Sequence, residues 1–385
     1  MKLLKAFGIC MAFIVPLIFF GCQSSSKKNS DYYLYVGTYT RDSSQGIYEY
    51  KFDASDGSLK QLGVTKGVTD PSYLAISPDH NYLYAVNEYR YSNQSGGKLS
   101  AFSINKNDGS LTHLNTTSTK GTSPCYVSVD HTGRYAFAAN YSSGSFSMFP
   151  INSDGSLDSA SVTVQHHGSS INKDRQSSPH VHCTHLTPDN KYLIVDDLGT
   201  DHVYQYDFSA DSGSFNSNPV HTYEVKPGVG PRHITFSPNG KYAYLVTEMG
   251  GLVYAFRYQD NRMQQIQSIS TLPKGYDGPI AGADIHLSPD GKFLYASMRE
   301  DLNQIVIYSI NQENGQLTFV SRHSTGGIRP RNFMIDPTGK YLLAANMNSD
   351  NIVVFKRDKN TGKLSDTGIE ANVSMPVCLK MIPTD

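Results

Sequence analysis

The sequence predicts an all-β fold, a seven-bladed β-propeller built of four-stranded blades, and three observations lead to this prediction. A turn of the Ser-Pro-Asp-Gly type, flanked by strands rich in Tyr and Leu, recurs about every 50 residues, which is the spacing of propeller blades. A second turn, of the Asp-Gly-Ser-Leu type, recurs with the same period. No apolar repeat at helical spacing of useful length lies between the strands.

The first 22 residues have the layout of a bacterial lipoprotein signal. Two lysines precede an apolar run over residues 6–20, which ends just before Gly21 and Cys22. The run contains Pro16 and is shorter than the roughly 20 residues that a helix needs to cross a bilayer. We expect residues 1–22 to be removed with lipidation of Cys22; an ordinary signal peptide or an uncleaved anchor is the alternative.

Residues 23–30 are polar and read as a flexible tether, so that the propeller should occupy residues 31–385. This layout predicts an exported lipoprotein on the periplasmic side or outer membrane of a bacterium, in contact with the membrane through its lipid anchor only. Gln23 replaces the aspartate associated with inner-membrane retention, which favours the outer membrane.

Composition narrows the class of partner. The formal net charge is −1, with no basic field for nucleic acid and no acidic tail, so a small molecule or a protein is the expected partner. The cysteines beyond the signal, Cys125, Cys183 and Cys378, have no zinc-site spacing and are odd in number. At least one thiol should be free, and disulfides should not hold the fold.

The two turn motifs differ in number, and the difference predicts how the ring closes. The Ser-Pro-Asp type begins at Ser77, Asp130, Thr187, Ser237, Ser288 and Asp336, whereas the other type occurs seven times, beginning at Asp56, Asp108, Asp154, Ser212, Asp260, Asn314 and Thr361. The chain starts with a strand that has no predecessor and ends with an orphan strand over residues 375–383. We expect this last strand to complete the first blade and remove the open edges.

Charged residues recur where the innermost strands enter the axis. At one register they are Ser72, Cys125, His182, Arg232, Ala283, Arg331 and Val377, and one position on they are Tyr73, Tyr126, Cys183, His233, Asp284, Asn332 and Cys378. The neighbouring strands return to the same mouth at Glu88, Tyr141, Asp197, Glu248, Arg299 and Asn346. Solvated strand ends usually carry Lys and Glu, and the absence of Lys here favours a functional pocket.

The residue types at this mouth indicate the chemistry. Guanidiniums offer planar forks of donors to a carboxylate, a phosphate or a developing oxyanion. Histidine beside glutamate suits proton transfer near neutral pH. We therefore expect an anionic, oxygen-rich small molecule as the ligand.

Four motifs carry a resemblance to a known family: a loop with Gln165-His166, Gly168, Asn172 and Arg175-Gln176 followed by Pro179-His180-Val181-His182; Gly230-Pro231-Arg232-His233 with Glu248; Ala283-Asp284-Ile285-His286 with Arg299; and Arg329-Pro330-Arg331-Asn332. From about Tyr35 to its end the chain resembles the propeller lactonases, which include cycloisomerase-type 6-phosphogluconolactonases and fungal carboxymuconate cyclases. The resemblance implies an active site of His182, or alternatively His180, with Arg232, Glu248 and Arg299.

The resemblance implies a carboxylic-ester hydrolase that opens the lactone of a sugar acid. We expect His182 or Glu248 to activate water, Arg232 and Arg299 to stabilise the oxyanion, and further residues to bind substrate: His180, His233, Asp284, His286, Arg331 and Asn332. No Gly-x-Ser-x-Gly elbow is present. The resemblance implies a substrate like 6-phosphogluconolactone. Export would separate the protein from cytoplasmic phosphorylated lactones, so an unphosphorylated aldonolactone is the alternative substrate.

Other readings stay open. Family members also form lactones, so a muconate-type cycloisomerase is an alternative, as is a non-enzymatic surface propeller that binds a protein or a glycan. An enzyme would lose turnover on Arg232→Ala or Glu248→Ala with little loss of stability. The histidines between residues 166 and 185 could suggest zinc, but no fixed carboxylate completes a triad, and we expect neither a metal nor a cofactor.

Overall fold

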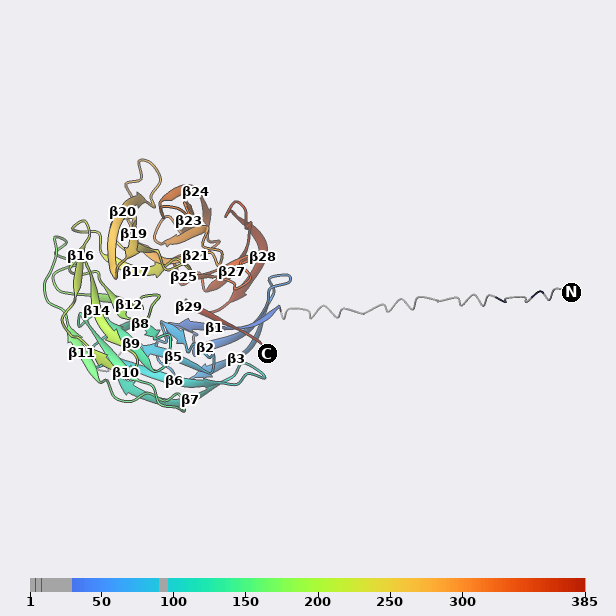
Figure 1. Ribbon diagram of the computed structural model, residues 1–385, viewed down its shortest axis with the longest axis horizontal. Helices are drawn as coiled ribbons and strands as arrows, with labels where there is room; N and C mark the ends of the chain where they lie inside the picture. The colour runs from blue at the N-terminus through green and yellow to red at the C-terminus, as the bar shows by residue number, and fades with distance from the viewer. Residues whose placement is uncertain (1–3, 5–7, 9–29, 90–95, 385) are drawn as a thin grey trace.

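The computed structural model describes Leu4, Gly8 and residues 30–89 and 96–384. Apart from Leu4, Gly8 and Ser30, the predicted signal with its lipidation site Cys22 and the predicted tether over residues 23–30 lie outside the described residues. Within the described part, the strands form seven sheets arranged around a centre, as predicted (Figure 1). No helix in this described part has the length and hydropathy of a membrane span.

Each sheet is one blade, and Figure 1 shows its first strand near the centre and its last strand at the rim. The first three blades are β29 (Pro376–Pro383), β1 (Asp31–Thr38), β2 (Gly46–Asp53) and β3 (Leu59–Lys66); β4 (Leu74–Ile76), β5 (Tyr82–Asn87), β6 (Lys98–Ile104) and β7 (Leu111–Ser118); and β8 (Pro124–Val129), β9 (Tyr135–Asn140), β10 (Ser145–Pro150) and β11 (Val162–Gln165). The last three are β17 (Pro231–Phe236), β18 (Tyr242–Thr247), β19 (Leu252–Gln259) and β20 (Arg262–Ser270); β21 (Gly282–Leu287), β22 (Phe293–Met298), β23 (Gln304–Ile310) and β24 (Leu317–Ser324); and β25 (Pro330–Ile335), β26 (Tyr341–Asn346), β27 (Asn351–Arg357) and β28 (Leu364–Asn372).

The fourth blade departs from the predicted four strands. It contains β12 (Val181–Leu186), β13 (Tyr192–Asp197) and β14 (His202–Ser209), and its outer strand is divided into β15 (Ser214–Phe215) and β16 (His221–Glu224). Both pieces pair with β14. The segment between them includes Pro219, which cannot donate to a strand ladder, so the outer position is filled by two short strands.

The Ser-Pro-Asp type turns join the two inner strands of the blades. The residue in the fourth position has a positive φ in all six, at His80, Gly133, Asn190, Gly240, Gly291 and Gly339. The side-chain oxygen in the first position also caps the turn: Ser77 Oγ, for example, accepts the N–H of Tyr82 at 2.9 Å. Glycine and asparagine tolerate the left-handed conformation, which explains why they recur there.

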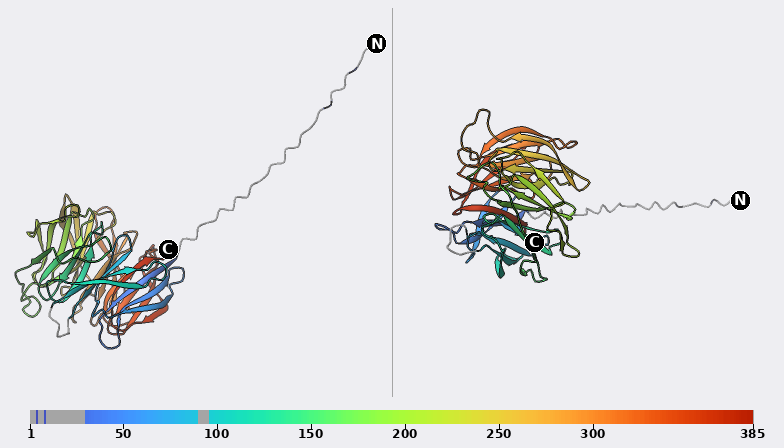
Figure 2. Two further views of the ribbon diagram at one scale, coloured as in Figure 1. Left: turned by 90° about the horizontal axis from the view of Figure 1, so that it is seen from below. Right: turned by 90° about the vertical axis from the view of Figure 1, so that its left-hand side faces the viewer.

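The C-terminal strand completes the first blade, as the unequal motif counts predict. β29 pairs with β1 from Tyr32 opposite Pro383 to Thr38 opposite Pro376. The innermost strands contact one another around the whole ring, including β29 with β4. The views of Figure 2 show the beginning of β1 beside the end of β29, so the two ends of the propeller are joined in one sheet.

Tyrosines link neighbouring blades. The hydroxyls of Tyr35, Tyr84, Tyr244 and Tyr295 each donate to the carbonyl oxygen of a glycine in the outer turn of the next blade, at Gly109, Gly155, Gly315 and Gly362. These side chains are fully buried between sheets. The recurrent tyrosines therefore serve the packing of blades. Cys125, Cys183 and Cys378 are buried, and none of them forms a disulfide in the described part of the chain.

Candidate active site

β-Bulges in the innermost strands aim the side chains of the site. The pairing register shifts at Cys125 in β8, at His182 in β12, at Arg232 in β17 and at Arg331 in β25. A bulge places an extra residue on one strand and turns its side chain away from the regular alternation. Consecutive residues such as Arg232 and His233 can therefore both face the axis.

The side chains surround a cavity of about 260 Å³ at the mouth where the innermost strands begin. This volume is near the small end of the range for small-molecule sites. Its lining is almost entirely polar and consists of Glu88, Cys125, Tyr141, Arg175, His182, Glu248, Arg299, Arg329 and Arg331. Four arginines face two glutamates, so the cavity suits an anionic ligand.

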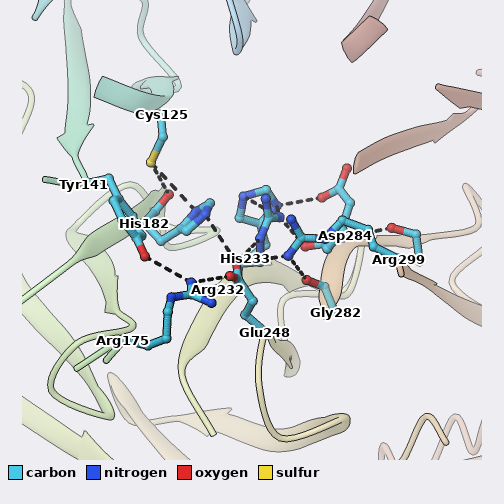
Figure 3. A network of polar contacts seen from close by, with 12 residues as sticks. Cys125, Tyr141, Arg175, His182, Arg232, His233, Glu248, Gly282, Asp284 and Arg299 are labelled. Atoms are coloured by element: carbon cyan, nitrogen blue, oxygen red, sulfur yellow. Dashed lines mark hydrogen bonds and ion pairs between the residues drawn. The ribbon is translucent and has the colours of Figure 1, made fainter. Parts of the chain in front are cut away.

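Glu248 lies at the centre of these charges (Figure 3). Its Oε2 is 3.1 Å from Arg232 Nε and 3.1 Å from Arg299 Nη2, and its Oε1 accepts a hydrogen bond of 2.6 Å from Arg175 Nη2. Burial would raise the pKa of this carboxyl, but Arg299, Arg232, His182 and Arg175 together lower it well below its usual value. Glu248 is therefore ionised at neutral pH.

The backbone of Glu248 is fixed from both sides. Its N–H donates to Gly230 O at 2.8 Å, and its carbonyl oxygen accepts from the N–H of Gly282 at 2.7 Å. A side chain at Gly282 would bring a Cβ within 2.2 Å of Thr247 O. The absence of a side chain thus allows β21 to approach the residue that precedes Glu248.

His182 is buried beside the carboxylate, with Nε2 3.9 Å from Glu248 Oε2. Its ring contacts the ring of His233 with centroids 5.1 Å apart, and Nδ1 lies 3.8 Å from the thiol sulfur of Cys125. Burial, Arg232 and His233 lower the pKa of His182 well below its usual value. The ring is therefore neutral at neutral pH and can accept or donate a proton only transiently.

Arg331 faces the cavity from β25, two blades along the ring from the blade that carries Glu248. Its guanidinium lies over Tyr39, 5.6 Å from the ring centroid, and the Tyr39 hydroxyl donates to Glu88 at 2.8 Å. Arg329 lies nearby at the rim, paired with Glu300 at 3.2 Å. These arginines extend the positive charge from Glu248 to the far wall of the cavity.

A buried hydrogen-bonded line continues below the cavity along the axis. Asp284 binds Nδ1 of His233 at 2.7 Å and Nε2 of His286 at 2.9 Å, and its second oxygen also accepts from the amide of Asn332. Burial would raise the pKa of Asp284, but His286 and His233 lower it well below its usual value. The carboxylate holds His233 under Arg232 and joins three innermost strands, β17, β21 and β25.

The structure brings most of the sequence-predicted site residues together, but it divides them into two groups, one lining the cavity and one below it. His182, Glu248, Arg299 and Arg331 line the cavity, whereas His233, Asp284, His286 and Asn332 form the line below it. Arg232 is 1% exposed and lies behind Glu248, and it is not among the described lining residues. Its Nη1 also donates to the carbonyl of Ala283.

The histidines between residues 166 and 185 do not converge. His180 stacks on Tyr141 with ring centroids 4.5 Å apart, outside the cavity lining. His166 is buried between Asp197 at 2.8 Å and the Tyr206 hydroxyl at 2.9 Å. Over the described ranges, no three His, Cys, Asp or Glu side chains gather as a metal site would require.

Sequence reasoning gave no catalytic or binding role to Arg175, Tyr141, Cys125, Glu88 or Arg329, although the structure shows that all five line the cavity. Cys125, Tyr141 and Glu88 stand at positions that the blade alignment places at this mouth, so their register was the available signal. Arg175 lies in the long segment between β11 and β12, to which the alignment of blades does not apply.

Comparison with known proteins agrees with this architecture. Residues 33–381 match the family described as lactonase, 7-bladed beta-propeller. The 6-phosphogluconolactonase of Bacillus subtilis is 37% identical over 350 residues, which are 90% of this chain and 97% of that protein. The 6-phosphogluconolactonase of Formosa agariphila is 36% identical over 351 residues, 90% of this chain and 99% of that one.

A solved structure is similar over nearly the whole propeller. The periplasmic gluconolactonase of Pseudomonas aeruginosa superposes with a TM-score of 0.87 and 36% identity, covering 92% of this chain and 100% of that one. With the family match over residues 33–381, this establishes that the chain belongs to the lactonase family of seven-bladed β-propellers.

Proposed function

We propose that this protein hydrolyses the lactone of a sugar acid in the cavity around Glu248. One observation carries the proposal: an ionised carboxylate is fixed at the cavity wall, with one oxygen held by two buried guanidiniums and the other at the cavity side. The relatives named 6-phosphogluconolactonase and gluconolactonase support it.

In the proposed reaction, Glu248 Oε1 accepts a proton from water as the water oxygen bonds to the lactone carbonyl carbon. Arg299 and Arg331 stabilise the negative charge that develops on the carbonyl oxygen. The bond between the carbonyl carbon and the ring oxygen then breaks, and the ring oxygen takes the proton from Glu248, directly or through His182. The new carboxylic acid releases one proton to solvent.

The proposed roles divide the arginines into two kinds. Arg232 is a positioning residue, because its Nε holds Glu248 Oε2 at 3.1 Å from behind. Arg299 reaches both Glu248 and the carbonyl of Gly282, at 3.1 and 2.8 Å, and also lines the cavity. Burial lowers the pKa of Arg299 to about 9, so its guanidinium stays charged at neutral pH.

The substrate is proposed to carry an acid group besides the lactone. Four arginines and two glutamates line the cavity, and Arg331 makes no ion pair with a described carboxylate. A guanidinium that faces a cavity and has no ion-paired carboxylate among the described residues favours binding of a carboxylate or phosphate. Both a phosphorylated lactone and a lactone with a second carboxylate meet this requirement.

The test is proton release, measured by pH-stat, from the purified propeller mixed with neutral glucono-δ-lactone, a glucaric acid lactone and 6-phosphoglucono-δ-lactone. The proposal expects acid formation above the spontaneous rate with at least one of these lactones, and loss of that activity in Glu248→Gln. Hydrolysis at the spontaneous rate with all three would contradict it, as would an unchanged rate in Glu248→Gln.

We also propose that the protein is an exported lipoprotein anchored through Cys22, as its first 22 residues indicate. The named periplasmic location of the Pseudomonas aeruginosa relative supports export. In a bacterial host, Cys22→Ser should shift the protein from the membrane fraction to the soluble fraction and abolish incorporation of labelled fatty acid. Equal labelling and fractionation of the variant and the wild type would exclude this anchor.

A further inference from the structure

Arg175 differs from the other guanidiniums that bind Glu248. Arg232 and Arg299 are buried residues that hold Oε2, whereas Arg175 holds Oε1 and its side chain is 43% exposed. Figure 3 shows Arg175 approaching Glu248 from the side of Tyr141 and His182, and Arg299 lying on the other side. One cationic partner of Glu248 is therefore within reach of solvent and ligand.

This partner occupies the oxygen that the proposed hydrolysis needs. With Arg175 bound at 2.6 Å, Oε1 already accepts a strong, charge-assisted hydrogen bond and is a weak proton acceptor. Removing one cation from a carboxylate makes it more basic. Departure of Arg175 would free Oε1 for water and leave Oε2 still fixed by Arg232 and Arg299.

The side chain of Arg175 can leave without unfolding its segment. Its backbone N–H is held by Asn172, both by the carbonyl oxygen and by the side chain. The next residue, Gln176, is buried and donates to Leu198 O at 2.8 Å and to Asp201 at 2.7 Å. Among the described residues, the guanidinium hydrogen-bonds only to Glu248 and the Tyr141 hydroxyl, so rotation of one half-exposed side chain is sufficient.

We propose that Arg175 is a specificity-determining latch: it pairs with Glu248 in the free protein and transfers to the acid group of the substrate, which unmasks Glu248 as the base. The inference rests on the proposed hydrolysis at this site. The substrate then needs an acid group for fast turnover as well as for tight binding. Neutral lactones would enter the cavity but leave the latch closed.

The charges that face Glu248 set the size of this effect. They are Arg232 from β17, Arg299 after β22, His182 from β12 and Arg175 from the loop, with Tyr141 after β9 and Arg329, Arg331 and Glu88 across the cavity. Only Arg175 combines a contact to Glu248 with a half-exposed side chain among them. Its removal should therefore alter the base and the substrate preference together.

The experiment compares Arg175→Gln with wild type on the neutral and the two acidic lactones. We expect kcat/KM for the acidic lactones to fall about 10- to 100-fold, as loss of a charge-assisted hydrogen bond implies, and kcat for the neutral lactone to rise. The acidic limb of the pH profile of kcat/KM for the neutral lactone should move to higher pH, because Glu248 loses a cation. Arg175→Lys should recover part of the preference for acidic lactones.

Arg329→Gln is the matched control, since it removes one guanidinium from the same rim without a contact to Glu248. It should weaken acidic lactones through lost attraction but leave the acidic limb of the pH profile in place. Equal losses on neutral and acidic lactones in Arg175→Gln, with an unmoved acidic limb, would overturn the latch. Comparison of 6-phosphoglucono-δ-lactone with the glucaric acid lactone shows whether a phosphate or a carboxylate binds Arg175.

A binding measurement separates the latch from the proposed hydrolysis. Calorimetric titration with the open-chain acids gluconate, glucarate and 6-phosphogluconate should show tighter binding of the two diacids, lost in Arg175→Gln. If wild type opens no lactone but this binding pattern holds, the proposed function fails and the role of Arg175 in recognising acid groups stands. If lactones are opened and binding is indifferent to Arg175, the latch alone fails.

Discussion

Arg232 and Glu248 form an ion pair within one blade: Nε of Arg232, at the bulge of β17, lies 3.1 Å from Oε2 of Glu248, which directly follows β18. The two residues are only 1% and 7% exposed. A bulge in one strand and the end of its neighbour thus fix a buried charge pair at the wall of the cavity. The pair connects the fold of the blade to the chemistry of the site.

Arg232→Met should lower both activity and stability. The substitution keeps much of the volume but removes one of the two buried guanidiniums that hold Glu248 Oε2, leaving Arg299, and removes the hydrogen bond from Arg232 Nη1 to the carbonyl of Ala283. Breaking a buried pair from one side costs about 3 to 5 kcal/mol when the remaining charge is left unpaired, and because Arg299 and Arg175 still pair with Glu248 we expect a smaller loss, about 1 to 3 kcal/mol, in the free energy of unfolding measured in urea. The sequence alone suggested little loss of stability here.

The double variant Arg232→Met/Glu248→Gln is the control for this argument. If the cost comes from the charge pair between Arg232 and Glu248, the double variant should lose less stability than the sum of the two single variants. Simple additivity would show that Arg232 contributes through packing alone.

Glu248→Gln should abolish turnover while the propeller stays folded. The amide is nearly isosteric with the carboxylate, but it is a far weaker proton acceptor, and loss of a general base lowers kcat about 10²- to 10⁴-fold. The measurement is kcat on the best lactone of the panel, with circular dichroism to check the fold. Glu224→Gln, at an exposed side chain of β16, should keep full activity; retained turnover in Glu248→Gln would remove this residue as the base.

The fold could be predicted from the sequence because each blade repeats its turns. Positions with a positive φ, such as Gly240, favour glycine or asparagine, so the turns can be recognised and counted in the sequence. The outer turns outnumber the Ser-Pro-Asp type turns by one, which predicts that β29 joins β1. The divided outer strand of the fourth blade was not predicted. Its sequence between β14 and β16 lacks the regular alternation from which a single long strand could be inferred.

The candidate site could be predicted only where the repeat fixes the register. His182, Arg232 and Arg331 occupy one position of the aligned inner strands, and each lies at a bulge. The family resemblance includes Arg175, but the blade register could not place it at the site, because its segment has no counterpart in other blades. Its position depends on contacts distant in sequence, such as Gln176 with Asp201.

Acid should destabilise the protein below about pH 6.5. Burial and Arg232 lower the pKa of His233 to about 3, and His182 is shifted in the same direction, so both rings are neutral in the fold when they are protonated in the unfolded chain. The unfolded state then binds more protons, and stability falls as pH decreases, by up to about 1.4 kcal/mol per pH unit for each ring.

This slope is measurable by urea unfolding between pH 7 and pH 4. His233→Gln should reduce this slope by up to about 1.4 kcal/mol per pH unit, the contribution of one proton, whereas His131→Gln, at an exposed side chain, should leave the slope unchanged. An identical slope in His233→Gln and wild type would mean that His233 is protonated in the fold as readily as in the unfolded chain.

Asp196→Asn should stabilise the protein, and by more as the pH rises. Asp196 is fully buried in β13, and within the described residues neither carboxyl oxygen has a hydrogen-bond partner. Burial raises its pKa well above the usual value, which the neighbouring Cys183 thiol offsets only in part. The folded state therefore keeps a proton that the unfolded state loses above about pH 4, and wild-type stability falls with rising pH by up to about 1.4 kcal/mol per unit.

Asparagine cannot ionise, so the stability gained by Asp196→Asn should be near zero at pH 4 and increase toward pH 8, whereas Asp366→Asn, at an exposed side chain, should show no such trend. A constant difference between variant and wild type across this range would mean that Asp196 is ionised in the fold. Between pH 4 and 6.5, the proton retained by Asp196 and the protons excluded from His182 and His233 act in opposite directions. In Asp196→Asn, the free energy of unfolding should therefore fall more steeply with decreasing pH than in the wild type, because the opposing contribution of the Asp196 carboxyl is gone.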